Sequence, residues 1–229
     1  MKTVSDSKRA FYNHHTRPIN SVYRRVIEEL LVEMHLLSVN ADFNSDPIYY
    51  LGVVTSFERL MQGYQPEKDK QSIFNALCKS TDGDPEVYKE QAGSLLSLAQ
   101  GKTLEELIEW LGNPQSQEGG ENIVEPIQAI AKNQNFKYSR PFGIGLYTLL
   151  EEADLELIKD DKKRNETLDT LAEKLNLPAE KLKKDLELYR SNLEKMEQLL
   201  KVIEDVLQAG RKQRERREQE KQTKETATE

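Results

Sequence analysis

The strongest constraint on the fold is a heptad pattern of apolar residues between Leu182 and Leu207, with spacings that alternate between four and three. This spacing is typical of one long helix with a coiled-coil seam, and such a seam needs another helix to cover it. The seam consists of Leu182, Leu186, Tyr189, Leu193, Met196, Leu200, Ile203 and Leu207. The cover comes either from the chain's own helices or from a partner or second copy. We predict an all-α fold, a helical bundle with a long protruding C-terminal helix of coiled-coil character.

Signals that start helices recur along the rest of the chain. Asp46-Pro47 and Asp84-Pro85 each place a capping carboxylate before a proline that suits the first helical turn. Thr103 and Glu106 have the spacing of a capping box, in which each side chain bonds to the other residue's backbone. Strand signals are nearly absent, which agrees with an all-helical chain.

The C-terminal end differs in composition from the rest. Apolar residues almost vanish after Gly210, and charges of both signs alternate from there to the end. A helix from Ala179 to about Gln219 would be about 60 Å long, longer than a small domain is wide. We predict a helical bundle over residues 1–164, a helical hairpin and long C-terminal helix over 165–221, and a disordered tail over 222–229.

Charge and composition narrow the classes of function. The formal net charge of −7 opposes general affinity for nucleic acids and for anionic membranes. Cys78 is the only cysteine, so no disulfide forms within the chain. No apolar run is long enough to span a bilayer, and the N-terminus does not look like a secretion signal. We expect a soluble, unprocessed protein.

Residues that carry chemistry do not form a recognisable constellation. His14 and His15 are adjacent, so on a helix they point about 100° apart and do not face one metal ion. The calcium-loop spacing that starts at Asp42 fails at Pro47, where glycine is required, and at Val53, where a bidentate glutamate belongs. We expect no enzymatic activity, no cofactor and no metal.

A glycine pair within residues 143–145 has a structural interpretation. It lacks the preceding strand and the third glycine of a dinucleotide-binding loop. The pattern instead predicts a place where two helices approach closely.

Residues 168–186 offer an alternative class of function. Their apolar spacing, with a small residue in a first helix and a turn before a second, matches a DNA-binding helix-turn-helix. The second helix carries a mixture of lysines and acidic residues and continues far beyond a groove-length segment. We therefore favour a tight hairpin that starts the long helix, and the DNA-binding regulator is the alternative hypothesis.

Several segments together resemble the thylakoid formation protein family. They are residues 3–12 (TVSDSKRAFY), 15–25 (HTRPINSVYRR), 28–37 (EELLVEMHLL), 51–57 (LGVVTSF) and, more loosely, 139–146 (SRPFGIGL). The likeness spans nearly the whole chain and is most specific over the first 65 residues. The tail after Gly210 matches least.

The resemblance implies a role rather than a reaction. Members of this family are photosystem II biogenesis factors of cyanobacteria and chloroplasts, and the chain looks like a cyanobacterial member. It would then be a non-enzymatic accessory factor in thylakoid biogenesis and photosystem II assembly and repair. The expected partners are FtsH protease complexes and photosystem II assembly intermediates, with no nucleic acid. The expected location is the cytoplasm, peripheral on the cytoplasmic face of the thylakoid membrane, with direct membrane contact left open.

Two surfaces are candidates for binding partners. One is the outer part of the long helix, with Tyr189, Leu193, Met196, Leu200, Ile203 and Leu207. The other is an N-terminal stretch rich in aromatic and cationic groups, which interfaces favour: Tyr12, His14, His15, Arg17, Tyr23, Arg24 and Arg25. For this stretch the alternative is that Tyr12 and Tyr23 pack internally while the arginines pair with glutamates.

Overall fold

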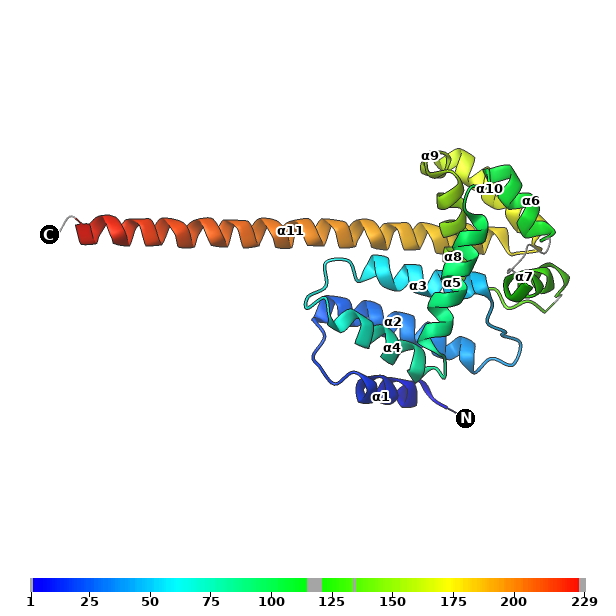
Figure 1. Cartoon of the computed structure of the whole chain (residues 1–229), viewed down its shortest axis with the longest axis horizontal. Helices are drawn as coiled ribbons and strands as arrows, with labels where there is room; N and C mark the ends of the chain where they lie inside the picture. The colour runs from blue at the N-terminus through cyan, green and yellow to red at the C-terminus, as the bar shows by residue number, and fades with distance from the viewer. Residues whose placement is uncertain (1, 115–120, 134, 227–229) are drawn as a thin grey trace. The chain divides into compact units, whose positions relative to one another are not determined.

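The computed structural model describes residues 2–114, 121–133 and 135–226, and over these residues the backbone forms eleven helices and no strand (Figure 1). The predicted all-α class and the long C-terminal helix are confirmed. The helices are α1 (Val4–His14), α2 (Ser21–Ser38), α3 (Pro47–Leu60), α4 (Asp69–Ser80), α5 (Pro85–Ala99), α6 (Leu104–Gly112), α7 (Glu121–Lys132), α8 (Arg140–Ala153), α9 (Leu155–Lys159), α10 (Asp161–Lys174) and α11 (Ala179–Thr226).

The starts of the helices follow the local signals of the sequence. The Asp46 carboxylate accepts bonds from the backbone N–H groups of Ile48 and Tyr49, at 2.9 Å each, and so caps α3. Asp84 caps α5 in the same way, and Thr103 with its partner three residues later forms the capping box of α6. These bonds satisfy N–H groups that a helix leaves without an internal partner.

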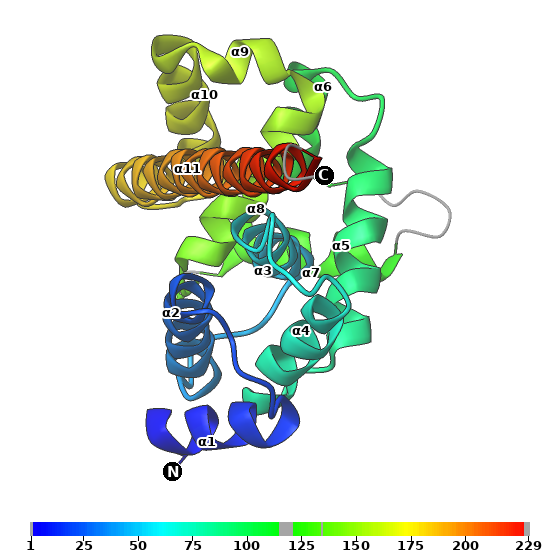
Figure 2. The ribbon, with the colours of Figure 1, turned by 90° about the vertical axis from the view of Figure 1, so that its left-hand side faces the viewer.

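The centre of the first 189 residues is the crossing of α3 and α8, which the two views of Figures 1 and 2 both place inside the group of helices. Every residue from Pro141 to Leu150 is buried. A Cβ atom on Gly52 would lie 1.6 Å from the Pro141 carbonyl oxygen, and one on Gly145 would lie 1.9 Å from the Ile48 carbonyl oxygen. The backbones therefore touch at Gly145, one of the two glycines for which a close approach was predicted.

The N-terminal helix α1 packs against α2 and α4. A buried hydrogen bond of 2.9 Å joins the Ser7 hydroxyl to His35 Nδ1 of α2. A second bond of 2.9 Å joins His15 Nδ1, at the end of α1, to the Ser72 hydroxyl of α4. With the fully buried Phe11, these contacts fix α1 on the bundle.

The contacts divide the chain into two units, Met1–Tyr189 and Arg190–Glu229, and α11 belongs to both. The domain limits predicted from the sequence stay predictions, as do the protrusion and the coiled-coil character of the long helix. Of the predicted tail, residues 222–226 belong to α11 and residues 227–229 lie outside the described part of the chain.

Candidate functional site

Two residues of the N-terminal candidate surface lie in the interior. His15 is 2% exposed and bonded to Ser72, and burial lowers its pKa. Tyr23 is 6% exposed, and its hydroxyl donates a 3.0 Å bond to the Gln62 carbonyl oxygen. Neither side chain offers much surface to a partner. The position of Tyr23 is the one that the internal alternative expected for it.

The other five residues of this stretch stay at or near the surface. Tyr12 is 37% exposed, and its hydroxyl donates a 2.9 Å bond to Glu28. Partial burial and this carboxylate raise the pKa of Tyr12 to about 12. Arg17 forms an ion pair with the buried Asp69. His14, Arg24 and Arg25 are exposed. The N-terminal surface is thus narrower than the sequence indicated, and its role stays a prediction.

A groove of about 900 Å³ runs along α2 and includes part of this surface. The helix contributes residues from Ser21 to Leu37, and Lys8 of α1 adds to the same lining. The remainder comes from residues 137–140, at the start of α8, and from Lys181 and Asp185 in the first turns of α11. We call this feature the α2 groove, and all of its lining belongs to the unit Met1–Tyr189.

Six Lys or Arg and four Asp or Glu side chains line the α2 groove, and most of them form pairs. The paired side chains are Lys8 with Glu28 at 2.8 Å, Arg25 with Glu29 at 3.1 Å, and Arg140 with Glu33 at 2.7 Å. Burial raises the pKa of Glu33, and the Arg140 guanidinium counteracts that shift. Arg24, Lys137 and Lys181 make no ion pair with any residue that the structure describes.

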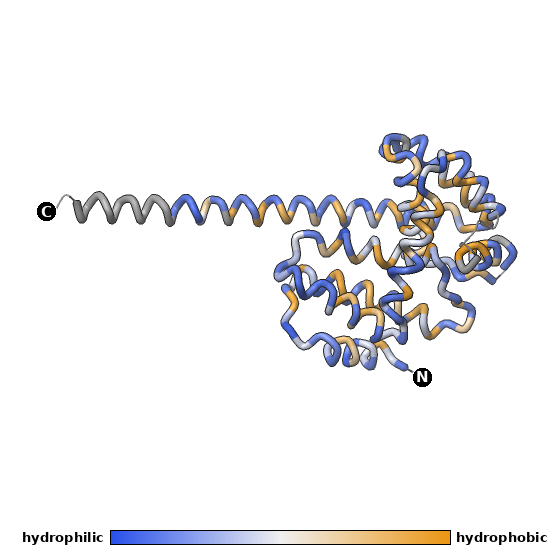
Figure 3. The backbone as a smooth tube through the Cα atoms, in the orientation of Figure 1, coloured by the Kyte–Doolittle hydropathy of each residue, from blue (hydrophilic) through white to orange (hydrophobic). Residues whose placement is uncertain are grey.

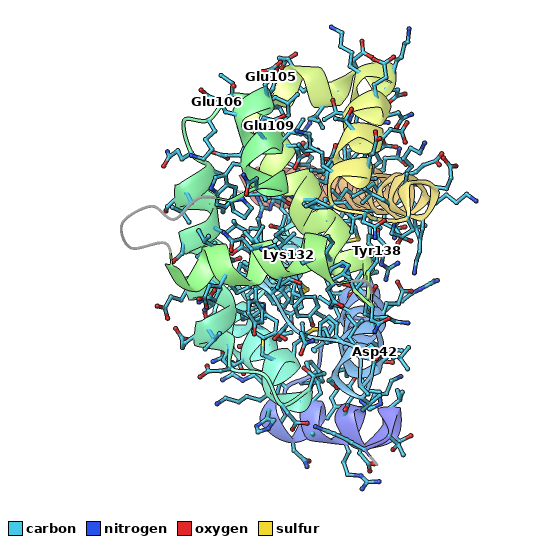
Figure 4. All side chains as sticks on the ribbon, turned by 90° about the vertical axis from the view of Figure 1, so that its right-hand side faces the viewer. Asp42, Glu105, Glu106, Glu109, Lys132 and Tyr138 are labelled. Carbon is cyan, nitrogen blue, oxygen red and sulfur yellow. The ribbon has the colours of Figure 1, made fainter. Side chains whose placement is uncertain are left out.

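One part of the groove holds buried polar atoms. Tyr138, labelled in Figure 4, is 7% exposed, and the Lys181 ammonium lies 5.2 Å from the centre of its ring. The Tyr138 hydroxyl and Asp185 Oδ2 are both buried, and the Asp185 carboxylate lies close enough to act on the tyrosine hydroxyl. Burial is the main cause that raises the pKa of Tyr138, and the nearby Asp185 carboxylate raises it further.

The candidate partner-binding residues of the long helix differ in how far their side chains are exposed. Tyr189 and Met196 are buried, and Leu193 and Leu200 are half-buried. Ile203 is 42% exposed, whereas the side chain of Leu207 lies outside what the structure describes. Figure 3 shows apolar residues recurring along α11 among polar ones.

Exposed apolar side chains concentrate on one stretch of α11. Val202 is 58% exposed and Val206 is 65% exposed, and Ile203 lies beside them. The spacing of four between the two valines places them on one face of the helix. We call these three residues the α11 patch.

The hairpin behind the DNA-binding alternative is formed by α10 and the start of α11. Asn176 has a φ of 52° in the turn, and the Leu177 N–H bonds to the Ala172 carbonyl oxygen at 2.8 Å. Lys183, on the helix that would enter DNA, pairs with Asp169 at 2.9 Å and with Glu180. Nothing else in the described residues favours DNA binding.

The described residues hold neither a metal-binding cluster nor a membrane-spanning helix. No group of three or more His, Cys, Asp or Glu side chains there is arranged to hold a metal ion. No helix in the same residues combines the length and the apolar character needed to cross a membrane.

Comparison with known proteins gives the family. The family model described as "Thylakoid formation protein" matches residues 3–218. The chain belongs to the thylakoid formation protein family. Among its relatives, Protein Thf1 of Crocosphaera subtropica is 59% identical over 215 residues, which are 93% of this chain and 87% of the relative. Protein Thf1 of Rippkaea orientalis is 58% identical over 217 residues, 94% of this chain and 92% of the relative.

A solved structure agrees with the family assignment. The structure of Psb29 at 1.55 Å matches with a TM-score of 0.81 and 46% sequence identity, over 93% of this chain and 99% of that one. The resemblance read from the sequence is therefore confirmed.

Sequence reasoning missed most of the α2 groove. Leu36, Lys137, Tyr138, Lys181 and Asp185 carry no shared local motif, because they come from three segments that lie far apart in the chain. Among the residues that line the groove, only the adjacent cations Arg24 and Arg25 were predicted from the sequence as candidates for binding a partner.

Proposed function

We propose that this protein is a non-enzymatic accessory factor in thylakoid biogenesis and photosystem II assembly and repair. It acts by protein-protein contact, and it binds and stabilises FtsH protease complexes. It works as a peripheral protein at the cytoplasmic face of the thylakoid membrane. A factor that binds only the assembled state of a complex stabilises that state by mass action, so no catalytic group is needed.

The observation that carries this proposal is the family match over residues 3–218. The α11 patch supports contact as the mode of action, because adjacent exposed apolar side chains on a helix are typical of a surface that a partner covers. Its three side chains lie in the unit Arg190–Glu229.

The test replaces the α11 patch with serine in the full chain, as the triple variant Val202→Ser/Ile203→Ser/Val206→Ser. These side chains are exposed, so the variant keeps the helix content of the wild type by circular dichroism. We expect FtsH complexes to co-purify with the wild type from photosynthetic cells and to be lost from the variant. Unchanged recovery would remove the α11 patch from the mechanism.

A matched control changes three exposed apolar residues elsewhere. Val39, Val87 and Leu155 are 37%, 38% and 51% exposed, and their serine variants also remove exposed apolar surface. We expect this control to retain the FtsH complexes. If the wild type itself recovers none, the proposed function is wrong.

A further inference from the structure

We propose that the α2 groove binds an acidic, amphipathic helix of a partner protein. This inference rests on the proposed function only in taking contact with proteins as the mode of action. It assigns a surface distinct from the α11 patch and a chemical class of ligand to that surface.

Charge selects an acidic ligand. Once the three ion pairs of the groove cancel, Arg24, Lys137, Lys181 and Asp185 remain, three cations against one carboxylate. The groove is thus locally positive on a chain whose formal net charge is −7. Complementary charge speeds encounter with acidic segments and disfavours basic ones.

Shape and apolar surface select a helix. Val32 and Leu36 are four residues apart on α2 and line the groove, and Leu36 is 57% exposed. From Ser21 to Leu37 the helix extends about 24 Å, enough for four turns of a second helix laid beside it. Grooves of this kind take the apolar face of an amphipathic helix. A flat bilayer does not enter a concave groove.

The first experiment identifies what lies in the groove. The photo-crosslinking residue p-benzoylphenylalanine replaces Leu36 in the full chain, expressed in photosynthetic cells, and a second chain carries it at the exposed Val87 as a control. We expect Leu36 to crosslink to a segment with net negative charge and helical apolar spacing, and Val87 not to. A neutral or basic segment, or no crosslink at Leu36, overturns the proposal.

The second experiment measures charge dependence. The crosslinked segment is synthesised as a labelled peptide, and its affinity is measured by fluorescence anisotropy. We expect Lys137→Glu/Lys181→Glu to bind it about tenfold more weakly or worse, with a reduced dependence on salt. The matched control Lys79→Glu/Lys163→Glu changes the net charge equally at exposed sites outside the groove and leaves affinity unchanged. Equal affinities for the two double variants contradict the proposal.

A third measurement separates a protein ligand from a lipid one. Vesicles of phosphatidylglycerol and phosphatidylcholine are floated with the wild type and with both double variants. If the groove variant alone leaves the vesicles while no crosslink forms at Leu36, the groove contacts lipid and the proposal is wrong. FtsH recovery is scored in the same cells, so failure of the proposed function is recognised independently of the groove.

Discussion

The crossing of α3 and α8 gives the sharpest prediction for stability. In Gly52→Ala the new Cβ would lie 1.6 Å from the Pro141 carbonyl oxygen and 2.5 Å from its carbon. Both atoms belong to the backbone, so no side chain can rotate away. The two helices must separate by about 1.8 Å before the methyl group reaches ordinary contact distance.

The cost follows from that separation. Overpacking a core usually costs about 1–3 kcal/mol. Here the displaced element is α8, in which every residue from Pro141 to Leu150 is buried, so packing is lost along the whole contact. We expect Gly52→Ala to lower the free energy of unfolding by about 3 kcal/mol or more, and Gly145→Ala to lower it by a similar amount. The double variant Gly52→Ala/Gly145→Ala should lose far less stability than the two single losses added together, because one separation of the helices relieves both clashes.

Urea unfolding followed by circular dichroism measures these changes. Gly93→Ala is the control, since Gly93 lies inside α5 with no heavy atom near the position of a Cβ. It should stabilise the chain by roughly 0.5–1 kcal/mol, because alanine favours helix over glycine. If each of Gly52→Ala and Gly145→Ala changes the free energy of unfolding by less than about 1 kcal/mol, which is on the order of experimental scatter, the close approach of the backbones is refuted.

Three further predictions concern buried groups. Cys78 is fully buried and burial raises its thiol pKa to about 12, so a thiol reagent should label it only after denaturation, as mass spectrometry would reveal. Ser7→Ala should lower the free energy of unfolding by about 1–3 kcal/mol, because His35 Nδ1 loses its buried partner; a loss below ~0.5 kcal/mol would argue against that bond. Burial raises the pKa of Asp46 from 3.8 to about 7, so the folded chain holds a proton that the unfolded chain has already released. Stability should therefore fall as the pH rises between these two values, and Asp46→Asn should flatten this dependence in urea titrations at several pH values.

The sequence predicted those parts of the fold that depend on local chemistry. The capping carboxylates of Asp46 and Asp84 act within three residues of their own position, so their spacing was enough to locate the starts of α3 and α5. The glycine pair in 143–145 was equally informative, because without a preceding strand a close helix contact was the remaining explanation.

The candidate site was less predictable, for two physical reasons. Aromatic and cationic residues are common at interfaces, yet the same tyrosine or histidine packs internally when a partner for its polar atom lies nearby, as Gln62 does for Tyr23. The α2 groove depends on contacts between residues about a hundred positions apart, such as the ion pair of Glu33 and Arg140, which no local pattern encodes.

The composition of the α2 groove also bears on when it becomes available during synthesis. One wall, α2, leaves the ribosome early, whereas Lys181 and Asp185 emerge only after most of the chain has been translated. Until then the nascent chain carries only the earlier part of the lining. The complete groove therefore exists only after the first turns of α11 have been synthesised.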